Sequence, residues 1–214
     1  MTTAEKVADI LLSINAITLR PNEPFTFSSG IKSPVYSDHR QLMGHPEERR
    51  KVIALMAAEV KKVGLPDFVA GTAMGAIPHA AWVSDVLNIP MVYVRDKPKA
   101  HGKQNLVEGF YKKDQKAIII EDLVSTGKSS IGTVKGLREV GCEVKDIVGI
   151  TTYTMKSAEE NFKEVGVTLH TLTDFPTIVS VAIQKGIMKE NEKELVLEWI
   201  KDPAAWGTQY GKQS

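Results

Sequence analysis

Near the start of the chain, apolar residues recur at the spacing of a helix. Further along, they occur in short runs of the length of a strand. Four apolar side chains between residues 7 and 14 recur at the spacing of one helix face. Residues 25–36 predict two short strands around a turn at Ser29-Gly30. Pro46 suits the first turn of a helix that we expect to reach about Val63. The chain therefore opens with a helix, a hairpin and a second helix.

From residue 68 onward, strands and helices alternate. We expect strands at 68–70, 91–94, 117–120, 144–154 and 168–172, and helices at 76–87, 129–140, 158–165 and 190–201. This alternation predicts an α/β fold with a central parallel sheet flanked by helices. Ligands of such sheets bind beyond the carboxyl ends of the strands. The loops at 71–75, 95–109 and 121–129 are therefore the candidate site.

Composition narrows the class of protein. A chain of 214 residues is long enough for one domain, 1–214, and 27 basic against 26 acidic side chains give a net charge of +1. This balance favours neither nucleic acid nor a membrane as partner, and no apolar run approaches the roughly 20 residues of a membrane span. Glu5 and Asp9 interrupt any signal peptide, and one cysteine, Cys142, allows no intrachain disulfide. We expect a cytoplasmic protein.

The segment 118–130 carries the strongest chemical signal. An apolar strand delivers two adjacent carboxylates, Glu121 and Asp122, to a loop rich in hydroxyls and glycine, and a helix begins near Lys128. The unpaired N–H groups of a helix start bind anions such as phosphate. Acids beside a phosphate repel it unless sugar hydroxyls or a magnesium ion bind them. A capped strand-to-helix turn is the structural alternative.

The same segment imitates the end of a nucleotide-binding P-loop. Gly127-Lys128-Ser129 matches that ending, but the motif requires a glycine where Asp122 stands. A carboxylate there would face the nucleotide's phosphates, so we exclude a P-loop.

A basic loop follows the strand at 91–94. Five basic side chains, Arg95, Lys97, Lys99, His101 and Lys103, fall within nine residues. The loop is long for a strand-to-helix connection and lies on the expected ligand side. We interpret it as an anion-binding loop that complements a diphosphate; a solvated charged loop is the alternative.

At this point the chain resembles the type I phosphoribosyltransferases, whose motif for phosphoribosyl pyrophosphate (PRPP) has the strand, acid pair and small loop of 118–130. The resemblance implies that Glu121 and Asp122 face the ribose and that Ser125 through Ser129 hold the 5′-phosphate. GTAMGAIPHAA at 71–81 resembles the second phosphate loop of the family. The PRPP-binding residues so implied are Arg95, Lys99, His101, Glu121, Asp122, Leu123, Val124, Ser125, Thr126, Gly127, Lys128, Ser129, Thr72 and Ala73.

Two further segments resemble the orotate-specific members. Arg-x-x-x-Lys-x-His-Gly at 95–102 is similar to their catalytic loop, which implies that Lys99 and His101 act on the pyrophosphate leaving group. FTFSSGIKSPVY at 25–36 is similar to their hood. Ser125, Tyr36, Phe25 and Arg40 are the candidate orotate-binding residues. Asp96 and Ser28 depart from the pattern, because some members carry a basic residue at each of these positions.

The resemblance, which covers about residues 18–154, implies a type I phosphoribosyltransferase fold with an N-terminal hood (18–40), a core (46–172) and a C-terminal helix (190–201). The implied reaction transfers phosphoribose from PRPP to N1 of orotate, giving orotidine 5′-monophosphate and pyrophosphate in pyrimidine biosynthesis. It also implies a magnesium ion, Mg²⁺, bound through PRPP with Asp122 as a possible ligand. We further expect a homodimer with active sites shared between subunits. The alternatives are transfer to a purine or uracil, or a PRPP-sensing regulator that binds nucleic acid.

Overall fold

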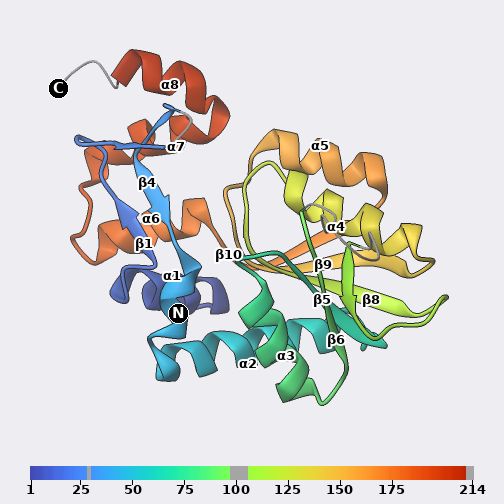
Figure 1. The fold of residues 1–214 in the computed structure, drawn as a ribbon. Helices are drawn as coiled ribbons and strands as arrows, with labels where there is room; N and C mark the ends of the chain where they lie inside the picture. The colour runs from blue at the N-terminus through green and yellow to red at the C-terminus, as the bar shows by residue number, and fades with distance from the viewer. Residues whose placement is uncertain (28–29, 97–105, 211–214) are drawn as a thin grey trace.

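The computed structural model describes residues 1–27, 30–96 and 106–210, with side chains up to Thr208. A six-stranded sheet forms the larger half of the molecule (Figure 1). Its order is β10-β9-β8-β5-β6-β7, and neighbours run parallel except at the β6–β7 pair. The strands are β5 (Phe68–Thr72), β6 (Met91–Val94), β7 (Val107–Gly109), β8 (Lys116–Val124), β9 (Glu143–Thr152) and β10 (Thr168–Asp174).

Helices cover both faces of the sheet, because both faces of its central strands are apolar. On one face lie α2 (Pro46–Val63) and α3 (Ile77–Leu87), and on the other lie α4 (Lys128–Glu139) and α5 (Lys156–Val165) (Figure 1). Within β8, Ile118 and Ile120 belong to the core on the α2 and α3 face, and Ile119 belongs to the core on the α4 and α5 face. The expected α/β fold is confirmed.

The hood region, residues 18–40, lies beside the sheet rather than within it (Figure 1). Strand β2 (Phe25–Thr26) pairs with β3 (Lys32–Ser33), as the turn at Ser29-Gly30 predicts, and β1 (Ile17–Leu19) pairs with β4 (Val35–Ser37). A short 3₁₀ helix, His39–Met43, leads into α2. Helix α1 (Thr3–Ser13) precedes the hood and begins with the capping box of Thr2 and Glu5.

The C-terminal segment returns to the hood. Helix α6 (Phe175–Gln184) packs against α1, and a 3₁₀ turn (Glu190–Glu192) leads into α7 (Lys193–Lys201) and α8 (Pro203–Tyr210). The Trp199 indole donates to the Lys32 carbonyl at 3.2 Å, and Gly207 of α8 packs against Lys32. The hood is therefore held between the sheet and the C-terminal helices. None of the described helices is both long and apolar enough to cross a membrane.

Several predicted boundaries need correction. Strand β8 continues through the acid pair to Val124, so the expected loop at 121–129 is confined to 125–127. Val107–Gly109 is an antiparallel edge strand, β7, and not loop, because it pairs with β6. Helices α6 and α8 are not among the predicted elements. In the helix expected at 190–201, the first three residues form a 3₁₀ turn that leads directly into α7 at Lys193.

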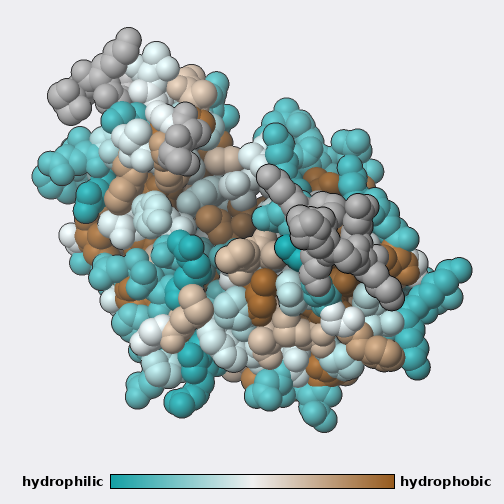
Figure 2. Space-filling model, viewed as in Figure 1, coloured by the Kyte–Doolittle hydropathy of each residue, from teal (hydrophilic) through white to brown (hydrophobic). Residues whose placement is uncertain are grey.

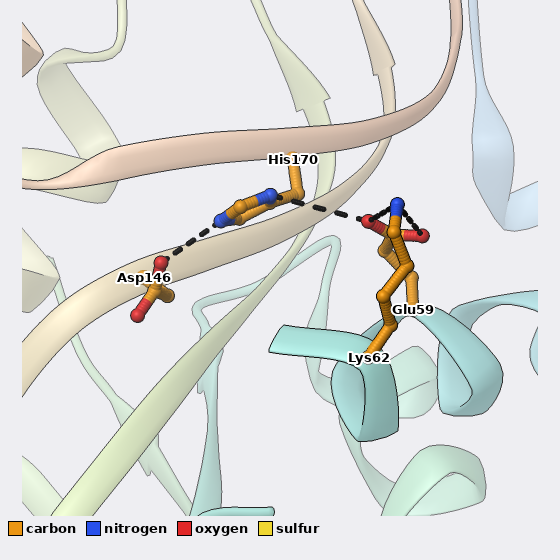
Figure 3. Close-up of polar contacts among 4 residues, drawn as sticks. All are labelled: Glu59, Lys62, Asp146 and His170. Atoms are coloured by element: carbon orange, nitrogen blue, oxygen red, sulfur yellow. Dashed lines mark hydrogen bonds and ion pairs between the residues drawn. The ribbon is translucent and has the colours of Figure 1, made fainter. Parts of the chain in front are cut away.

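A cluster of polar side chains joins α2 to strands β9 and β10 (Figure 3). The His170 ring lies between two carboxylates: Nε2 is 2.8 Å from Oδ1 of Asp146, and Nδ1 is 3.9 Å from Oε1 of Glu59. Lys62 pairs with Glu59 at 3.0 Å. Each ring nitrogen faces a different carboxylate, so the imidazole bridges a helix and two strands. A single metal ion could not use both carboxylates and the ring between them.

Candidate active site

The strand order defines where a ligand binds. From β5 the chain moves outward to β6, whereas β8, β9 and β10 extend in the opposite direction. A crevice opens where such a sheet reverses its order, beyond the carboxyl ends of the two central strands. Here those strands are β5 and β8, so the loops that follow Thr72 and Val124 flank the crevice.

A polar cavity of about 250 Å³ occupies this position. Its lining comes from the hood side, the β5 loop and the end of β8. The lining residues are Ser37, Asp38, His39, Arg40, Thr72, Ala73, Gly75, Glu121, Asp122, Leu123 and Ser129. Six residues of the predicted PRPP site and the orotate candidate Arg40 thus surround one cavity.

The two acids of β8 have different environments because successive side chains of a strand point to opposite faces. Glu121 is only 3% exposed, and its Oε2 accepts a hydrogen bond of 2.7 Å from the Ser130 hydroxyl of α4. Burial, and then the charge of Asp122, raise the pKa of Glu121 to about 8. Asp122 is partly exposed, so it presents the more accessible carboxylate to a ligand.

The loop after β8 leads into a helix start that has no side-chain cap. Gly127 takes a left-handed conformation at φ 76° and caps α4 without any side-chain hydrogen bond to the helix. The first N–H groups of α4 therefore remain available to an anion. A Cβ on Gly127 would lie 2.7 Å from Cζ of Phe162, so this position requires glycine. Lys128 and Ser129 are exposed at the helix start, whereas the Val124 side chain is buried in the core.

The β5 loop supplies the opposite wall. The Thr72 hydroxyl is buried and accepts a 3.1 Å hydrogen bond from Thr133 of α4, which ties the two walls together. Ala73 lines the cavity, and the Ala73–Met74 peptide is cis. Arg95 lies just beyond β6, where its Nη1 is 3.5 Å from Oε1 of Glu108. Arg95 does not line the polar cavity in this arrangement.

Two buried histidines lie near the acids. His39 Nε2 is 2.9 Å from the Thr151 hydroxyl, and His79 is fully buried in α3, with its ring edge-on to Trp82. Burial lowers the pKa of both rings, that of His79 to about 4. Both are therefore neutral at pH 7, and the buried position of His79 in α3 is that of a structural residue.

An adjoining apolar cavity of about 480 Å³ opens between the hood, α5 and α7. Figure 2 shows the molecule hollowed between these parts, with hydrophobic side chains in the hollow. The lining residues are Phe27, Ile31, Tyr36, Ser37, Leu123, Ser125, Thr126, Tyr153, Met155, Lys156, Ser157, Trp199, Ile200, Lys201 and Pro203. Two of them, Ser37 and Leu123, also line the polar cavity, so the two cavities meet there.

The four candidate orotate-binding residues do not all line the same cavity. Tyr36 and Ser125 line the apolar cavity. Phe25 does not, but its ring packs against that of Tyr36, with 5.5 Å between the two ring centroids. Arg40 is in the polar cavity, where its Nε donates to Asp38 at 2.6 Å. The arrangement therefore places Arg40 in the polar cavity and not in the apolar one.

Sequence reasoning missed several lining residues. Ser37 directly follows the motif residue Tyr36 and could have been included on that ground. Trp199 and Lys201 come from a helix that no motif connects with the site, so no local signal identifies them. The predicted catalytic residues Lys99 and His101 lie outside the described residues, as do Lys97 and Lys103.

Comparison with known proteins agrees with this geometry. The phosphoribosyl transferase domain model matches residues 39–182. An orotate phosphoribosyltransferase of Coxiella burnetii is 44% identical over 96% of this chain and 99% of its own length. One of Listeria monocytogenes serotype 4b is 46% identical over 97% of this chain and 100% of its own length.

Solved structures give the same result. The crystal structure of orotate phosphoribosyltransferase from Aeropyrum pernix superposes with a TM-score of 0.74 at 28% identity. The match covers 85% of this chain and 99% of that one. Both the motifs and the full-length similarity therefore assign this chain to the orotate phosphoribosyltransferase family.

Proposed function

We propose that this chain transfers the 5-phosphoribosyl group of PRPP to N1 of orotate, forming orotidine 5′-monophosphate and pyrophosphate in the biosynthesis of pyrimidine nucleotides. The observation that carries the proposal is the junction of the two cavities at Ser37 and Leu123. A polar cavity with an acid pair beside a free helix start suits a sugar phosphate. The adjoining apolar cavity suits a flat heterocycle.

The charges of the apolar cavity favour an anionic base. Lys156 and Lys201 line it, and its described lining includes no carboxylate. Orotate carries a carboxylate that uracil and the purines lack, so the two lysines favour it over those bases. This cavity is the reason to prefer orotate over the purine and uracil alternatives.

In the proposed complex, the chain binds PRPP in the polar cavity. The N–H groups at the start of α4 and the hydroxyls of Ser125, Thr126 and Ser129 hold the 5′-phosphate. Asp122 accepts hydrogen bonds from the ribose hydroxyls. Glu121 supports α4 through Ser130, with which it shares a buried hydrogen bond. Thr72 and Ala73 adjoin the diphosphate, with the backbone of the β5 loop offering N–H donors.

Nothing in the sequence offers an obvious covalent nucleophile for this chemistry, so we propose a transition state with oxocarbenium character. Catalysis then depends on positioning and on stabilising the negative charge that grows on pyrophosphate. Lys99, His101 and Arg95 supply positive charge to that leaving group, and Lys99 or His101 can donate a proton to it. Closure of the basic loop over the site would exclude water that could hydrolyse PRPP.

Magnesium fits this site as an ion carried by PRPP. Among the described residues no group of three or more side chains forms a metal site, so that part of the chain does not supply a coordination shell by itself. Asp122 is the partly exposed carboxylate beside the diphosphate position and is the ligand we propose. When bound, the ion neutralises charge on the diphosphate.

We also propose that the protein is a cytoplasmic homodimer whose basic loop serves the partner's site. The position of Arg95 supports this assembly, because it lies outside the polar cavity of its own chain. The single cysteine is consistent with a reducing compartment.

A base screen tests the reaction. The protein is incubated with PRPP and Mg²⁺ and with orotate, uracil, adenine or hypoxanthine in turn, and pyrophosphate release is measured. We expect release with orotate alone. Release with a purine or uracil instead would refute the assignment of the base. A protein that bound PRPP but released no pyrophosphate with any base would favour the regulator.

A further inference from the structure

Two side-chain contacts connect the end of β9 to the segment that enters the site from the hood. The Thr151 hydroxyl is 2.9 Å from Nε2 of His39, and the Tyr153 hydroxyl donates to Oγ of Ser37 at 3.0 Å. The partners are two residues apart on both segments, so the contacts form neighbouring rungs. Together they fix the position of Ser37 relative to the end of β9.

Tyr153 is held rigidly on its own side of this contact. Its ring is 5% exposed and packs edge-on against Trp199 and Phe175, with ring centroids at 5.2 and 5.5 Å. Burial raises the pKa of Tyr153 to about 12, so the phenol keeps its proton at pH 7. Within the described chain, Ser37 is the hydrogen-bond partner of that hydroxyl. In this hydrogen bond the Tyr153 hydroxyl donates and Oγ of Ser37 accepts.

This direction of bonding leaves Ser37 with a free donor. A serine hydroxyl has one hydrogen and two lone pairs, and Tyr153 occupies one lone pair. The hydrogen of Ser37 remains for another acceptor. Ser37 lines both cavities, and the other residue shared by the two cavities, Leu123, has an apolar side chain. The Ser37 hydroxyl is thus a hydrogen-bond donor at the point where base and ribose would meet.

We propose that Ser37 is a base-binding residue whose hydroxyl donates a hydrogen bond to an oxygen of the pyrimidine beside the nitrogen that receives the ribose, and that Tyr153 is its positioning residue. The inference rests on the proposed function. Orotate N1 is flanked by a carbonyl oxygen at C2 and a carboxylate at C6, both of which accept hydrogen bonds. The single donor of Ser37 matches either oxygen.

The test compares Ser37→Ala, Tyr153→Phe and the double variant with the wild type. Ser37→Ala should raise KM for orotate about 10-fold, the range for one hydrogen bond to a polar or charged acceptor. Tyr153→Phe keeps the ring and its packing but frees the serine to rotate, and should raise KM for orotate about 3-fold. The double variant should equal Ser37→Ala alone, because Tyr153 acts through Ser37.

PRPP binding distinguishes the two cavities that Ser37 lines. Titration calorimetry with Mg²⁺ and PRPP, without base, should give the same Kd for Ser37→Ala and the wild type. A weakened Kd for PRPP with unchanged KM for orotate would assign the hydroxyl to the ribose and overturn the proposal. Additive effects in the double variant would overturn the role of Tyr153.

Matched controls address loss of folding. Ser180→Ala removes an exposed hydroxyl of α6 that bonds Pro176, and Tyr111→Phe changes a partly buried tyrosine of the sheet half. Both should leave both KM values unchanged. If the wild type releases no pyrophosphate with orotate, the proposed function itself fails. If the wild type is active and Ser37→Ala retains its KM for orotate, this inference alone fails.

Discussion

Gly75 lies directly against the carboxylate of Asp122. A Cβ built on Gly75 would be 2.4 Å from Oδ2 and 3.0 Å from Cγ of Asp122, which is closer than real atoms approach. The residue beside the acid must therefore be glycine if Asp122 is to keep its position. The contact joins the β5 loop to the end of β8 across the crevice between the two strands.

Replacing Gly75 should therefore damage PRPP binding specifically. In Gly75→Ala the new methyl group displaces the Asp122 carboxylate, and loss of its charged hydrogen bonds should raise KM for PRPP about 10-fold or more. Steady-state kinetics with PRPP varied measures this. Gly132→Ala is the control, because its Cβ meets nothing within 4 Å. An unchanged KM for PRPP in Gly75→Ala would contradict the assignment of Asp122 to the sugar.

Removing divalent ions should abolish turnover. Asp122 at the end of β8 and the diphosphate of PRPP are both negative, and without a cation they repel one another. Activity should disappear in excess EDTA and return when Mg²⁺ is added beyond the chelator. Full turnover in chelator would show that the chain neutralises the diphosphate by itself.

Lys99→Ala should lower kcat by about 10²–10³, the range for one preorganised group that stabilises developing charge. Circular dichroism should remain native. Lys61→Ala, an exposed lysine in the last turn of α2, is the charge-matched control. A kcat near that of the wild type would make Lys99 a solvated residue only.

Glu121 should make stability fall as pH rises from about 5 to 8. Its pKa is raised to about 8 in the folded protein, chiefly by burial, from an ordinary value of 4.5. Within that window the folded state keeps a proton that the unfolded state releases, so the free energy of unfolding falls by up to about 1.4 kcal/mol per pH unit. Urea unfolding at several pH values measures the slope.

The isosteric variant Glu121→Gln should flatten this dependence, because the amide does not titrate. Glu139→Gln, at an exposed acid near the end of α4, should leave the slope as it is. Equal slopes in the wild type and Glu121→Gln would show that the buried acid is already ionised in the folded protein.

Mixing two inactive variants tests the shared active site. Lys99→Ala and Asp122→Asn are unfolded and refolded together, and random pairing gives about half heterodimers. If the loop acts on the partner's site, each heterodimer has one site with both residues intact, so about a quarter of all sites regain activity. If mass spectrometry shows heterodimers and no activity returns, the loop acts within its own chain.

The sequence by itself determined the fold class and the chemistry of the central segment. Both are local: strand runs buried on two faces are continuously apolar, and the acid pair, loop and helix start are contiguous between residues 118 and 130. Element boundaries were less accurate. The polar residues Glu121 and Asp122 resemble the start of a loop, but pairing with β9 continues the strand through them to Val124.

Only the tertiary structure decided how the site is assembled. The acid pair looks symmetric in the sequence, yet strand pleating buries Glu121 against Ser130 and leaves Asp122 beside Gly75. The apolar cavity combines Tyr36 with Trp199 and Lys201, more than 160 positions apart by their numbers. Such proximity depends on how the C-terminal helices pack on the hood, and side-chain packing between distant segments leaves no periodic or motif signal in a single sequence.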